Sequence, residues 1–342
     1  MSKRAAVGDA HLSGFQSDTL DKKGLPKRLG FIIKSLDFIV DFCNQKNIFD
    51  FDFLGDLVND KSIIYTVAQD AFKDFLVRRK NCRFRIISGN HDLSSTGDLQ
   101  KSAISVFSEY PNVKCFVGGP EVIDNITYIP FTEKFLETIK ISPPSDILIT
   151  HLGLNEAHLQ SGLSKVDKIS IKDLSKFKLA LMGHYHRPQD FSNGTTHVWY
   201  AGSLTNKDWN DKNEQKRFLI YDTETLEVES VPIDCGIPQF IELTINNETD
   251  KIEILKQAEI AKNNGNNVRI KNKSETVIKD EVSGGVLVLE QHDVDITDRG
   301  ITISMTKEEQ LKKYLSIKEI PEVECPEYLS LIAKYDLLHK DE

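Results

Sequence analysis

The chain lacks several features that mark particular classes of protein. No run of apolar residues approaches the roughly 20 that a membrane-spanning helix requires, so the sequence predicts no membrane association. Residues 1–7 lead directly into the first polar motif, so we expect no cleaved signal peptide. The cysteines number 5 and none forms a close pair. This pattern predicts reduced thiols in a cytoplasmic protein.

The chain also lacks an excess of positive charge. It carries 43 basic and 52 acidic residues, a formal net charge of -9. A nucleic-acid-binding protein usually shows a basic footprint, so any DNA binding must come from local patches, bound metal or a partner. One local cluster comprises Lys22, Lys23, Lys27 and Arg28, and a second comprises Arg78, Arg79, Lys80, Arg83 and Arg85. We interpret the second cluster as solvated helix ends and loops.

What is present indicates a folded protein with a sizeable core. The 342 residues include 39% hydrophobic and 28% charged residues, which is typical of globular proteins. This length favours one large domain and a smaller one.

Apolar patterns alternate between the strand and helix periods along the first 232 residues. A short strand is predicted to end at Val7. Helix-period stripes occupy 29–43 and 63–76, and further strands are predicted at 49–53, 84–87, 147–150, 179–182, 197–200 and 218–221. Such alternation predicts a layered α/β domain, which we place at 1–235.

Polar clusters follow these strands at five points. They read Gly8-Asp9-Ala10-His11, Gly55-Asp56, Gly89-Asn90-His91-Asp92, His151 and Gly183-His184-Tyr185-His186. The glycines allow sharp turns close to the ligands. A lone Gly-Asp or His-x-His is weak as a signal. An Asn-His pair after an apolar strand has no packing reason to be there, and five such clusters in order leave little room for a purely structural explanation.

Converging Asp, Asn and His side chains suit a two-metal phosphoesterase. Two divalent ions held about 3.5–4 Å apart generate a nucleophilic hydroxide and absorb charge on the phosphoryl oxygens. Nitrogen and oxygen ligands suit Mn, Fe or Zn, with Mg also open; Mn²⁺ is our expectation. Asp56 is the predicted bridge between the ions. Asp9, His11 and His186 are predicted to complete one shell, and Asn90, His151 and His184 the other.

Four further residues are predicted near the reaction centre. His91 is expected to stabilise the pentavalent phosphorus or to protonate the leaving oxygen, and Asp92 to orient His91. Arg187, directly after His186, is placed to meet a substrate phosphate, and Asn59 is a second candidate for that contact. Residues outside the clusters are interpreted as structural or exposed: Asp98, His158, His197, His292 and His339.

The pattern of predicted elements changes after residue 235. Strands are predicted at 240–245 and 268–270, a helix at 252–261, and an asparagine-rich turn at 262–267. We assign 236–304 to a small α+β cap. A capping-box helix start at 306–309 and an amphipathic stripe at 328–338 predict terminal helices within 305–342.

The five clusters resemble the calcineurin-type metallophosphoesterase signature over about residues 7–204. Within that superfamily the chain is most similar to the SbcD-type DNA repair and recombination nucleases and their phage relatives. Gly8-Asp9-Ala10-His11-Leu12, Tyr200-Ala201-Gly202-Ser203-Leu204 and the passage 231–240 carry this similarity, together with the terminal helices. The resemblance implies a four-layer α/β-β/α sandwich bearing the cap and the C-terminal helices.

The resemblance also implies a function. It implies a manganese-dependent exonuclease and endonuclease that processes double-stranded DNA ends as a homodimer, in a bacterial or phage-infected cytoplasm. The cap would contact DNA, and 305–342 would dock on an SbcC-like coiled-coil ATPase. Many family members carry a histidine three residues after the bridging Asp, where this chain has Asn59; this departure bears on directionality and rate.

Two other functions stay open from the sequence. One is a phosphomonoesterase or cyclic-nucleotide phosphodiesterase on the same metal scaffold, which the net acidity favours. The other is a non-catalytic scaffold that binds DNA ends or a partner. A scaffold would be expected to have lost metal ligands, and all the expected ligand positions are retained.

Overall fold

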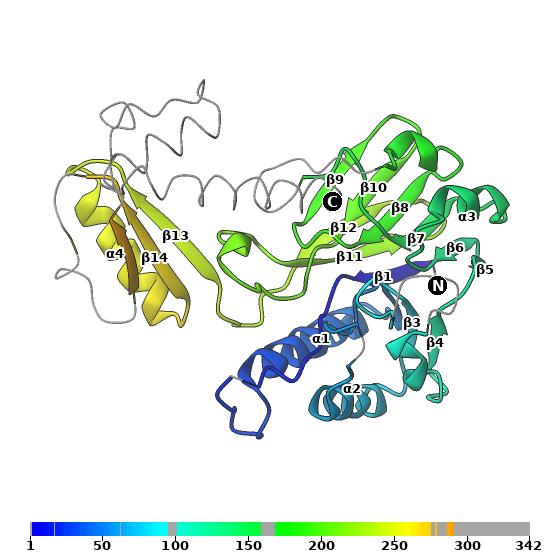
Figure 1. Ribbon diagram of the computed structural model, residues 1–342, viewed down its shortest axis with the longest axis horizontal. Coiled ribbons are helices and arrows are strands. Elements are labelled where there is room, and N and C mark those ends of the chain that lie inside the picture. Colours follow the sequence, from blue (N-terminus) through cyan, green and yellow to red (C-terminus); the bar gives the residue numbers. More distant parts are fainter. Residues whose placement is uncertain are drawn as a thin grey trace, which may run out of the picture. The chain divides into compact units, whose positions relative to one another are not determined.

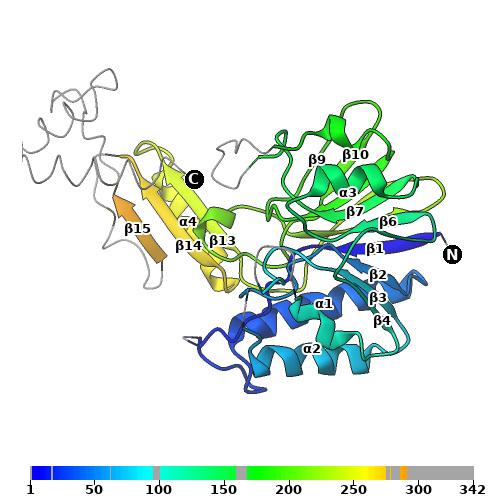
Figure 2. The ribbon, with the colours of Figure 1, turned by 45° about the vertical axis from the view of Figure 1, so that its right-hand side comes forward.

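The computed structural model describes residues 2–16, 18–61, 63–94, 101–158, 168–274, 278 and 286–290. Within these residues the chain forms two six-stranded sheets and a separate three-stranded sheet (Figures 1 and 2). None of the described helices combines the length and apolarity that a membrane span needs. Four of the cysteines, Cys43, Cys82, Cys115 and Cys235, are free thiols; Cys325 lies outside the described residues.

The first sheet has the strand order β12-β11-β1-β2-β3-β4. Its parallel centre consists of β1 (Lys3–Val7), β2 (Asp50–Phe53), β3 (Arg83–Ile87) and β4 (Val113–Phe116). The antiparallel strands β11 (Arg217–Asp222) and β12 (Val228–Pro232) complete it, so chain 217–232 returns to pair beside the N-terminal strand. Because β1, β2 and β3 are parallel, their carboxyl ends meet at one edge.

The second sheet has the order β5-β6-β7-β8-β10-β9. Its parallel strands are β6 (Ile126–Ile129), β7 (Ile147–His151), β8 (Leu179–Gly183) and β10 (His197–Tyr200), and antiparallel β5 (Glu121–Ile123) and β9 (Gln189–Ser192) flank them. The sequence predicted β7, β8 and β10. It did not predict the inner strand β6, nor the edge strands β5 and β9, which are short and carry little apolar pattern.

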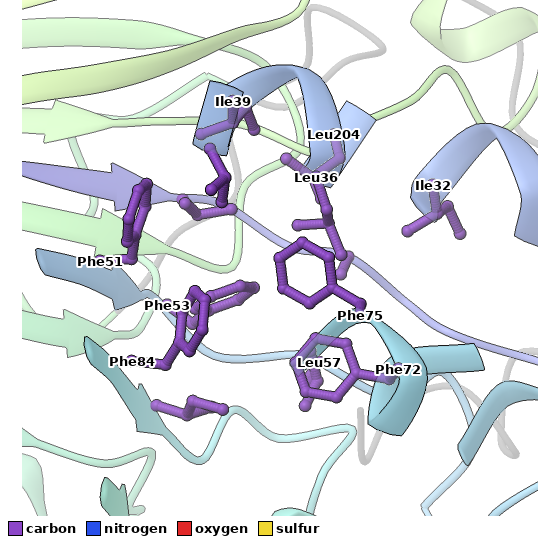
Figure 3. Packing of buried hydrophobic residues seen from close by; sticks show 14 of the residues in the cluster. Ile32, Leu36, Ile39, Phe51, Phe53, Leu57, Phe72, Phe75, Phe84 and Leu204 are labelled. Carbon is purple, nitrogen blue, oxygen red and sulfur yellow. The ribbon is translucent and has the colours of Figure 1, made fainter. Parts of the chain in front are cut away.

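The two sheets face each other and helices cover their outer faces. Between the sheets lies an apolar layer that includes Leu54, Phe116, Ile149 and Leu181. Helices α1 (Lys27–Gln45) and α2 (Thr66–Arg78) pack against the first sheet through a phenylalanine-rich core (Figure 3). Helix α3 (Phe135–Ile141) and the helical turns Ile171–Leu174 and 103–107 lie outside the sheets. This arrangement is the four-layer sandwich that the resemblance implied.

The strand predicted from the alternation of Phe49, Phe51 and Phe53 with two acids is present as β2, and both of its acids are buried. Asp52 is fully buried because its side of the strand faces the second sheet. Its carboxylate accepts hydrogen bonds from the Arg4 guanidinium at 2.8 and 3.0 Å and from the hydroxyls of Tyr128 and Tyr221, each at 2.7 Å. Tyr128 belongs to the second sheet, so this network ties the sheets together.

We expect Asp52→Ala to lower the free energy of unfolding by about 3–5 kcal/mol, because it removes a fully buried carboxylate that accepts hydrogen bonds from Arg4, Tyr128 and Tyr221. Arg4 then keeps Asp50, 3.1 Å away, as its carboxylate partner. Urea denaturation followed by fluorescence measures this loss. The control is Asp146→Asn, which breaks an exposed pair with Lys178 and should cost about 1 kcal/mol or less. Equal effects of the two substitutions would contradict the assigned role of Asp52.

A smaller unit follows the sandwich. Strands β13 (Phe240–Ile245), β14 (Asn267–Asn272) and β15 (Val286–Glu290) form a three-stranded sheet, and α4 (Lys251–Asn263) connects the first two. The predicted strand, helix, turn and strand of the cap are all present. Contacts divide the chain into one unit of 1–242 with 261–268 and another of 243–260 with the residues from 269 onward. The predicted terminal helices within 305–342 lie outside the described residues.

Candidate metal centre

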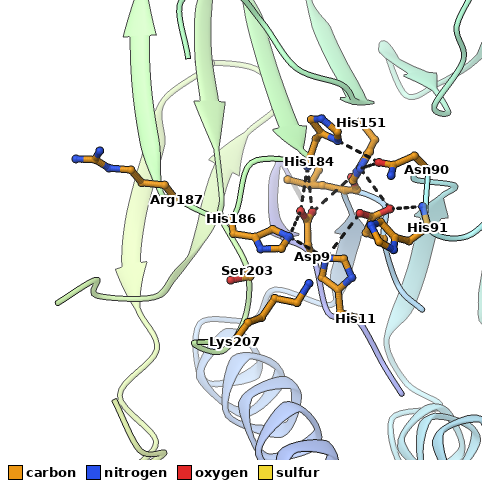
Figure 4. Close-up of polar contacts among 12 residues, drawn as sticks. Asp9, His11, Asn90, His91, His151, His184, His186, Arg187, Ser203 and Lys207 are labelled. Atoms are coloured by element: carbon orange, nitrogen blue, oxygen red, sulfur yellow. Dashed lines mark hydrogen bonds and ion pairs between the residues drawn. The ribbon is translucent and has the colours of Figure 1, made fainter. Parts of the chain in front are cut away.

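The five polar clusters converge at the carboxyl edges of the two sheets (Figure 4). From the first sheet, Asp9 follows β1, Asp56 follows β2 and Asn90 follows β3. From the second sheet, His151 ends β7, and His184 and His186 follow β8. The seven predicted ligands thus come together, although residues far apart in the sequence supply them.

One set of donor atoms surrounds Asp9. The Nε2 atoms of His11 and His186 lie 2.9 Å apart, and His186 Nε2 lies 3.8 Å from Asp9 Oδ2. His11 Nε2 is also 3.7 Å from Asp56 Oδ2. Asp9, His11 and His186 form a group whose ligand atoms are close enough to hold one ion. Two imidazole nitrogens directed at the same point suit a shared cation, so this donor set fits a divalent metal.

A second set surrounds Asn90. Its Oδ1 atom lies 3.1 Å from His151 Nε2 and 3.0 Å from His184 Nδ1. Asp56 Oδ1 lies 3.3 Å from His151 Nε2, so the Asp56 carboxylate has one oxygen toward each set. This position between the sets is the one that a bridging ligand needs.

Charges at the centre are strongly coupled. Burial raises the pKa of Asp9, and the neighbouring Asp56 carboxylate raises it further. Burial alone would also raise the pKa of Asp56, but His151 and His11 hold that pKa well below its usual range. Burial lowers the pKa of His186 to about 3. His186 is therefore neutral at pH 7, which is the form of imidazole that binds metal.

Three of the candidate ligands have strained backbones. His11, Asp56 and His184 have positive φ angles of 52°, 49° and 99°. Residues other than glycine rarely adopt this region, at a cost of about 1–3 kcal/mol each, and such strain concentrates at functional sites. The preceding glycines allow close approach: a Cβ on Gly89 would collide with Asp56, and one on Gly183 would lie 2.5 Å from Asp9 Oδ1.

His91 lies beside the donor sets with one ring nitrogen fixed. Its Nδ1 lies 2.6 Å from the Asn59 carbonyl oxygen, to which it donates, and its backbone N–H donates to Asp56 Oδ1 at 2.9 Å. The His91 ring meets the His11 ring edge-on, with centroids 4.9 Å apart. Nε2 is thus left to act on a substrate. His11, Asp56 and His91 also form a group that could hold an ion.

Asp92 does not contact the His91 ring, so the direct orienting role predicted for it belongs to the Asn59 carbonyl. The fully buried Asp92 carboxylate accepts backbone N–H groups of Gly89, Val58 and Leu57 at 2.8, 2.9 and 3.3 Å. These bonds join the loops after β2 and β3. Asp92 therefore positions His91 indirectly, by fixing the loop that presents the Asn59 carbonyl. The Asn59 side chain itself donates to Asp60 at 3.2 Å.

We expect Asp92→Ala to lower the free energy of unfolding by about 2–4 kcal/mol. Each buried backbone N–H left unpaired costs about 1–3 kcal/mol, and rearrangement of the loops recovers part of that cost. Chemical denaturation measures it. Turnover should fall as well, since the loop that holds His91 loosens. Unchanged stability would contradict the role of Asp92 as a link between loops.

The predicted phosphate contact Arg187 is exposed, and its side chain points away from the donor atoms (Figure 4). The reason is local: the chain turns into edge strand β9 at Gln189. A different cation, Lys207, is directed toward the site instead. Sequence reasoning missed Lys207 because it follows no apolar strand and belongs to no motif.

The two basic clusters differ in their ion pairing. In the second, Arg78 and Arg79 pair with Asp37, Arg83 with Asp50 and Arg85 with Asp124. This supports the interpretation of that cluster as structural. In the first, Arg28 pairs with Asp18 and covers the Phe15 ring, while Lys22, Lys23 and Lys27 are exposed. His197, predicted to be structural or exposed, pairs with Asp190 at the surface.

Known proteins resemble the chain at three levels. The family model of the calcineurin-like phosphoesterases matches residues 3–188. "Exonuclease subunit 1" of Enterobacteria phage T4 is 30% identical over 156 residues, 43% of this chain and 44% of that protein, so the alignment spans less than half of the relative.

Among solved structures, "GAP50 the anchor in the inner membrane complex of Plasmodium" aligns with a TM-score of 0.40 at 10% identity, covering 68% of this chain and 89% of that one. A hypothetical protein, PH1004, from Pyrococcus horikoshii OT3 aligns with a TM-score of 0.40 at 12% identity, covering 77% and 94%. The family match covers more than half of the sequence and contains the loops that supply all seven candidate ligands. The chain therefore belongs to the calcineurin-like phosphoesterase family.

Proposed function

We propose that this hydrolase is a two-metal-dependent DNA nuclease subunit that cleaves phosphodiester bonds at DNA ends, in recombination and repair. The observation that carries the proposal is the similarity to the phage T4 "Exonuclease subunit 1". The geometry supports it, because His91 stands beside two donor sets that share Asp56.

The chain's own residues would hold two divalent ions, which we propose to be Mn²⁺. Asp9, His11 and His186 would bind one and Asn90, His151 and His184 the other, with Asp56 between them. When bound, such ions supply Lewis acidity toward the phosphoryl oxygens and lower the pKa of water. The Leu54 carbonyl, 2.8 Å from His151 Nδ1, accepts from that nitrogen and leaves Nε2 to face the site.

His91 would move a proton during hydrolysis. Its Nδ1–H is held by the Asn59 carbonyl, so the transferable proton sits on Nε2 of the imidazolium. As water forms its bond to phosphorus and the bond to the leaving oxygen breaks, that oxygen would take the Nε2 proton. The attacking water would release one proton to solvent, and the neutral ring would take one back from solvent.

We further propose an assembly. The relative is named a subunit, which supports a multi-subunit enzyme. The proposed assembly is a cytoplasmic homodimer with an SbcC-like coiled-coil ATPase on 305–342 and DNA against the cap at 236–304. Deletion of residues 327–342 tests the docking: it should remove ATPase binding on gel filtration and leave weak hydrolysis. An intact complex would contradict it.

The substrate test offers end-labelled double-stranded DNA, a chromogenic diester and a chromogenic monoester to the protein in Mn²⁺. The proposal predicts cleavage of DNA and of the diester, with little turnover of the monoester. Monoester turnover without DNA cleavage would make the chain a phosphatase. Binding of DNA ends without any hydrolysis, in the presence of the ATPase, would favour the scaffold.

A further inference from the structure

A cavity of about 280 Å³ opens beside the Asp9 side of the candidate metal centre. Asp9, His11, Ser13 and Phe15 of the segment after β1 line it, together with Arg28 of α1 and Lys207 of the segment after β10. Its volume lies at the lower end of small-ligand sites, which gives room for a mononucleotide and not for a duplex.

Lys207 is a half-buried cation of the cavity wall. Among the residues that the structure describes, its ammonium forms no ion pair. Asp211, four positions later on the same turn, pairs with Lys216 and accepts the backbone N–H of Lys207. Asn206 also binds this turn, donating to the Asp211 carbonyl at 2.9 Å. The turn thus holds Lys207 in place without neutralising it.

An unpaired ammonium in a partly buried position is costly, so its neighbourhood must offer negative charge. Asp9 and Asp56 act most strongly on Lys207 electrostatically, followed by Asp211 and Asp208 of its own turn. Asp9 and Asp56 are candidate ligands of divalent ions. With ions bound, the field at Lys207 would become positive, and an external anion would be needed between the ammonium and the centre. A substrate phosphate is such an anion.

Another part of the cavity lining has a different chemistry. The Arg28 guanidinium lies 4.5 Å from the centroid of the Phe15 ring and donates to the Asp18 carboxylate at 2.9 Å. A ring covered by a fixed planar cation is a surface on which a nucleobase stacks. The Ser13 hydroxyl, directed to Asp60, adds a polar group to the wall.

We propose that this cavity is a nucleotide subsite, in which Lys207 binds a substrate phosphate and the Phe15–Arg28 pair receives the attached nucleoside. The inference rests on the proposed nuclease function and specifies where one end of the cleaved strand lies. It assigns to Lys207 the phosphate contact that the sequence had suggested for Arg187.

The test is direct binding of deoxyadenosine monophosphate to the Mn²⁺-loaded protein by isothermal titration calorimetry. Lys207→Gln should weaken binding by about tenfold or more, as expected for a lost charge-assisted hydrogen bond, and Lys207→Arg should restore most of it. Lys178→Gln removes the same charge at the opposite end of β8 and should leave binding unchanged. Wild-type affinity in Lys207→Gln would overturn the proposal.

Two further probes separate the parts of the ligand. Phe15→Leu keeps the apolar volume and removes the ring, so it should weaken binding of the nucleotide and leave binding of inorganic phosphate unchanged. Equal affinity of wild type for phosphate and nucleotide would overturn the nucleoside part. These measurements need no DNA cleavage: a protein that hydrolyses the chromogenic diester but not DNA would refute the nuclease, while the binding data would still decide the subsite.

Discussion

Asp56→Asn should reduce hydrolysis of a chromogenic diester by about 10³-fold or more, because each metal ion contributes several kcal/mol to transition-state stabilisation and this residue stands between both sites. The amide keeps the shape of the carboxylate. Asparagine also tolerates a positive φ, here 49°, so the variant avoids the backbone cost that alanine would add. The loss of activity in Asp56→Asn should therefore result from the missing metal ligand and not from a change in the loop.

The measurement is the initial rate at saturating Mn²⁺, with Asp146→Asn as the matched control. Asp146 is an exposed carboxylate paired with Lys178 before β7, at the other end of the second sheet. Its replacement should leave the rate unchanged. An Asp56→Asn enzyme within tenfold of wild type would show that Asp56 is not the bridge.

His91→Gln should lower kcat by about 100-fold or more while sparing metal affinity and DNA binding, as for a general acid. Glutamine can still donate to the Asn59 carbonyl, so the loop contact at 2.6 Å has a replacement. What it cannot do is deliver a proton from the position of Nε2. The loss should be largest for substrates with poor leaving groups, such as DNA, and smaller for an activated aryl ester.

A comparison of kcat on both substrates, with Mn²⁺ titrations of each variant, tests this role. His197→Gln is the control, since His197 is a surface residue paired with Asp190. If His91→Gln lost metal affinity in proportion to activity, His91 would be a ligand, as its grouping with His11 and Asp56 allows. Equal losses on both substrates would also contradict proton transfer.

The candidate ligands could be predicted from the sequence because each polar cluster lies at or just after the end of a strand. Parallel strands bring their carboxyl ends together, so order along the chain was enough to place Asp9, Asp56 and Asn90 on one edge. The start of α2 was less accurate. The apolar period suggested a start at Ile63, whereas the helix begins at Thr66 and Ile63 is 54% exposed.

The features that could not be predicted from the sequence depend on contacts with the second sheet and on the conformation of loops. Nothing local in the sequence shows that a second sheet covers Asp52, yet Asp52 is fully buried and accepts from the hydroxyl of Tyr128, 76 positions later in the chain. Asp92 looked like a partner of His91 because it is adjacent in sequence, yet its bonds go to backbone groups. Lys207 has no local signal, since only the folded turn directs it toward Asp9.

The most direct test of the two-ion centre is native mass spectrometry of the protein in Mn²⁺, beside Asp56→Asn. We expect two ions per wild-type chain and loss of affinity for both in the variant, because one carboxylate faces both donor sets. A wild-type chain that binds a single ion, or a variant that keeps two with unchanged affinity, would contradict the shared centre.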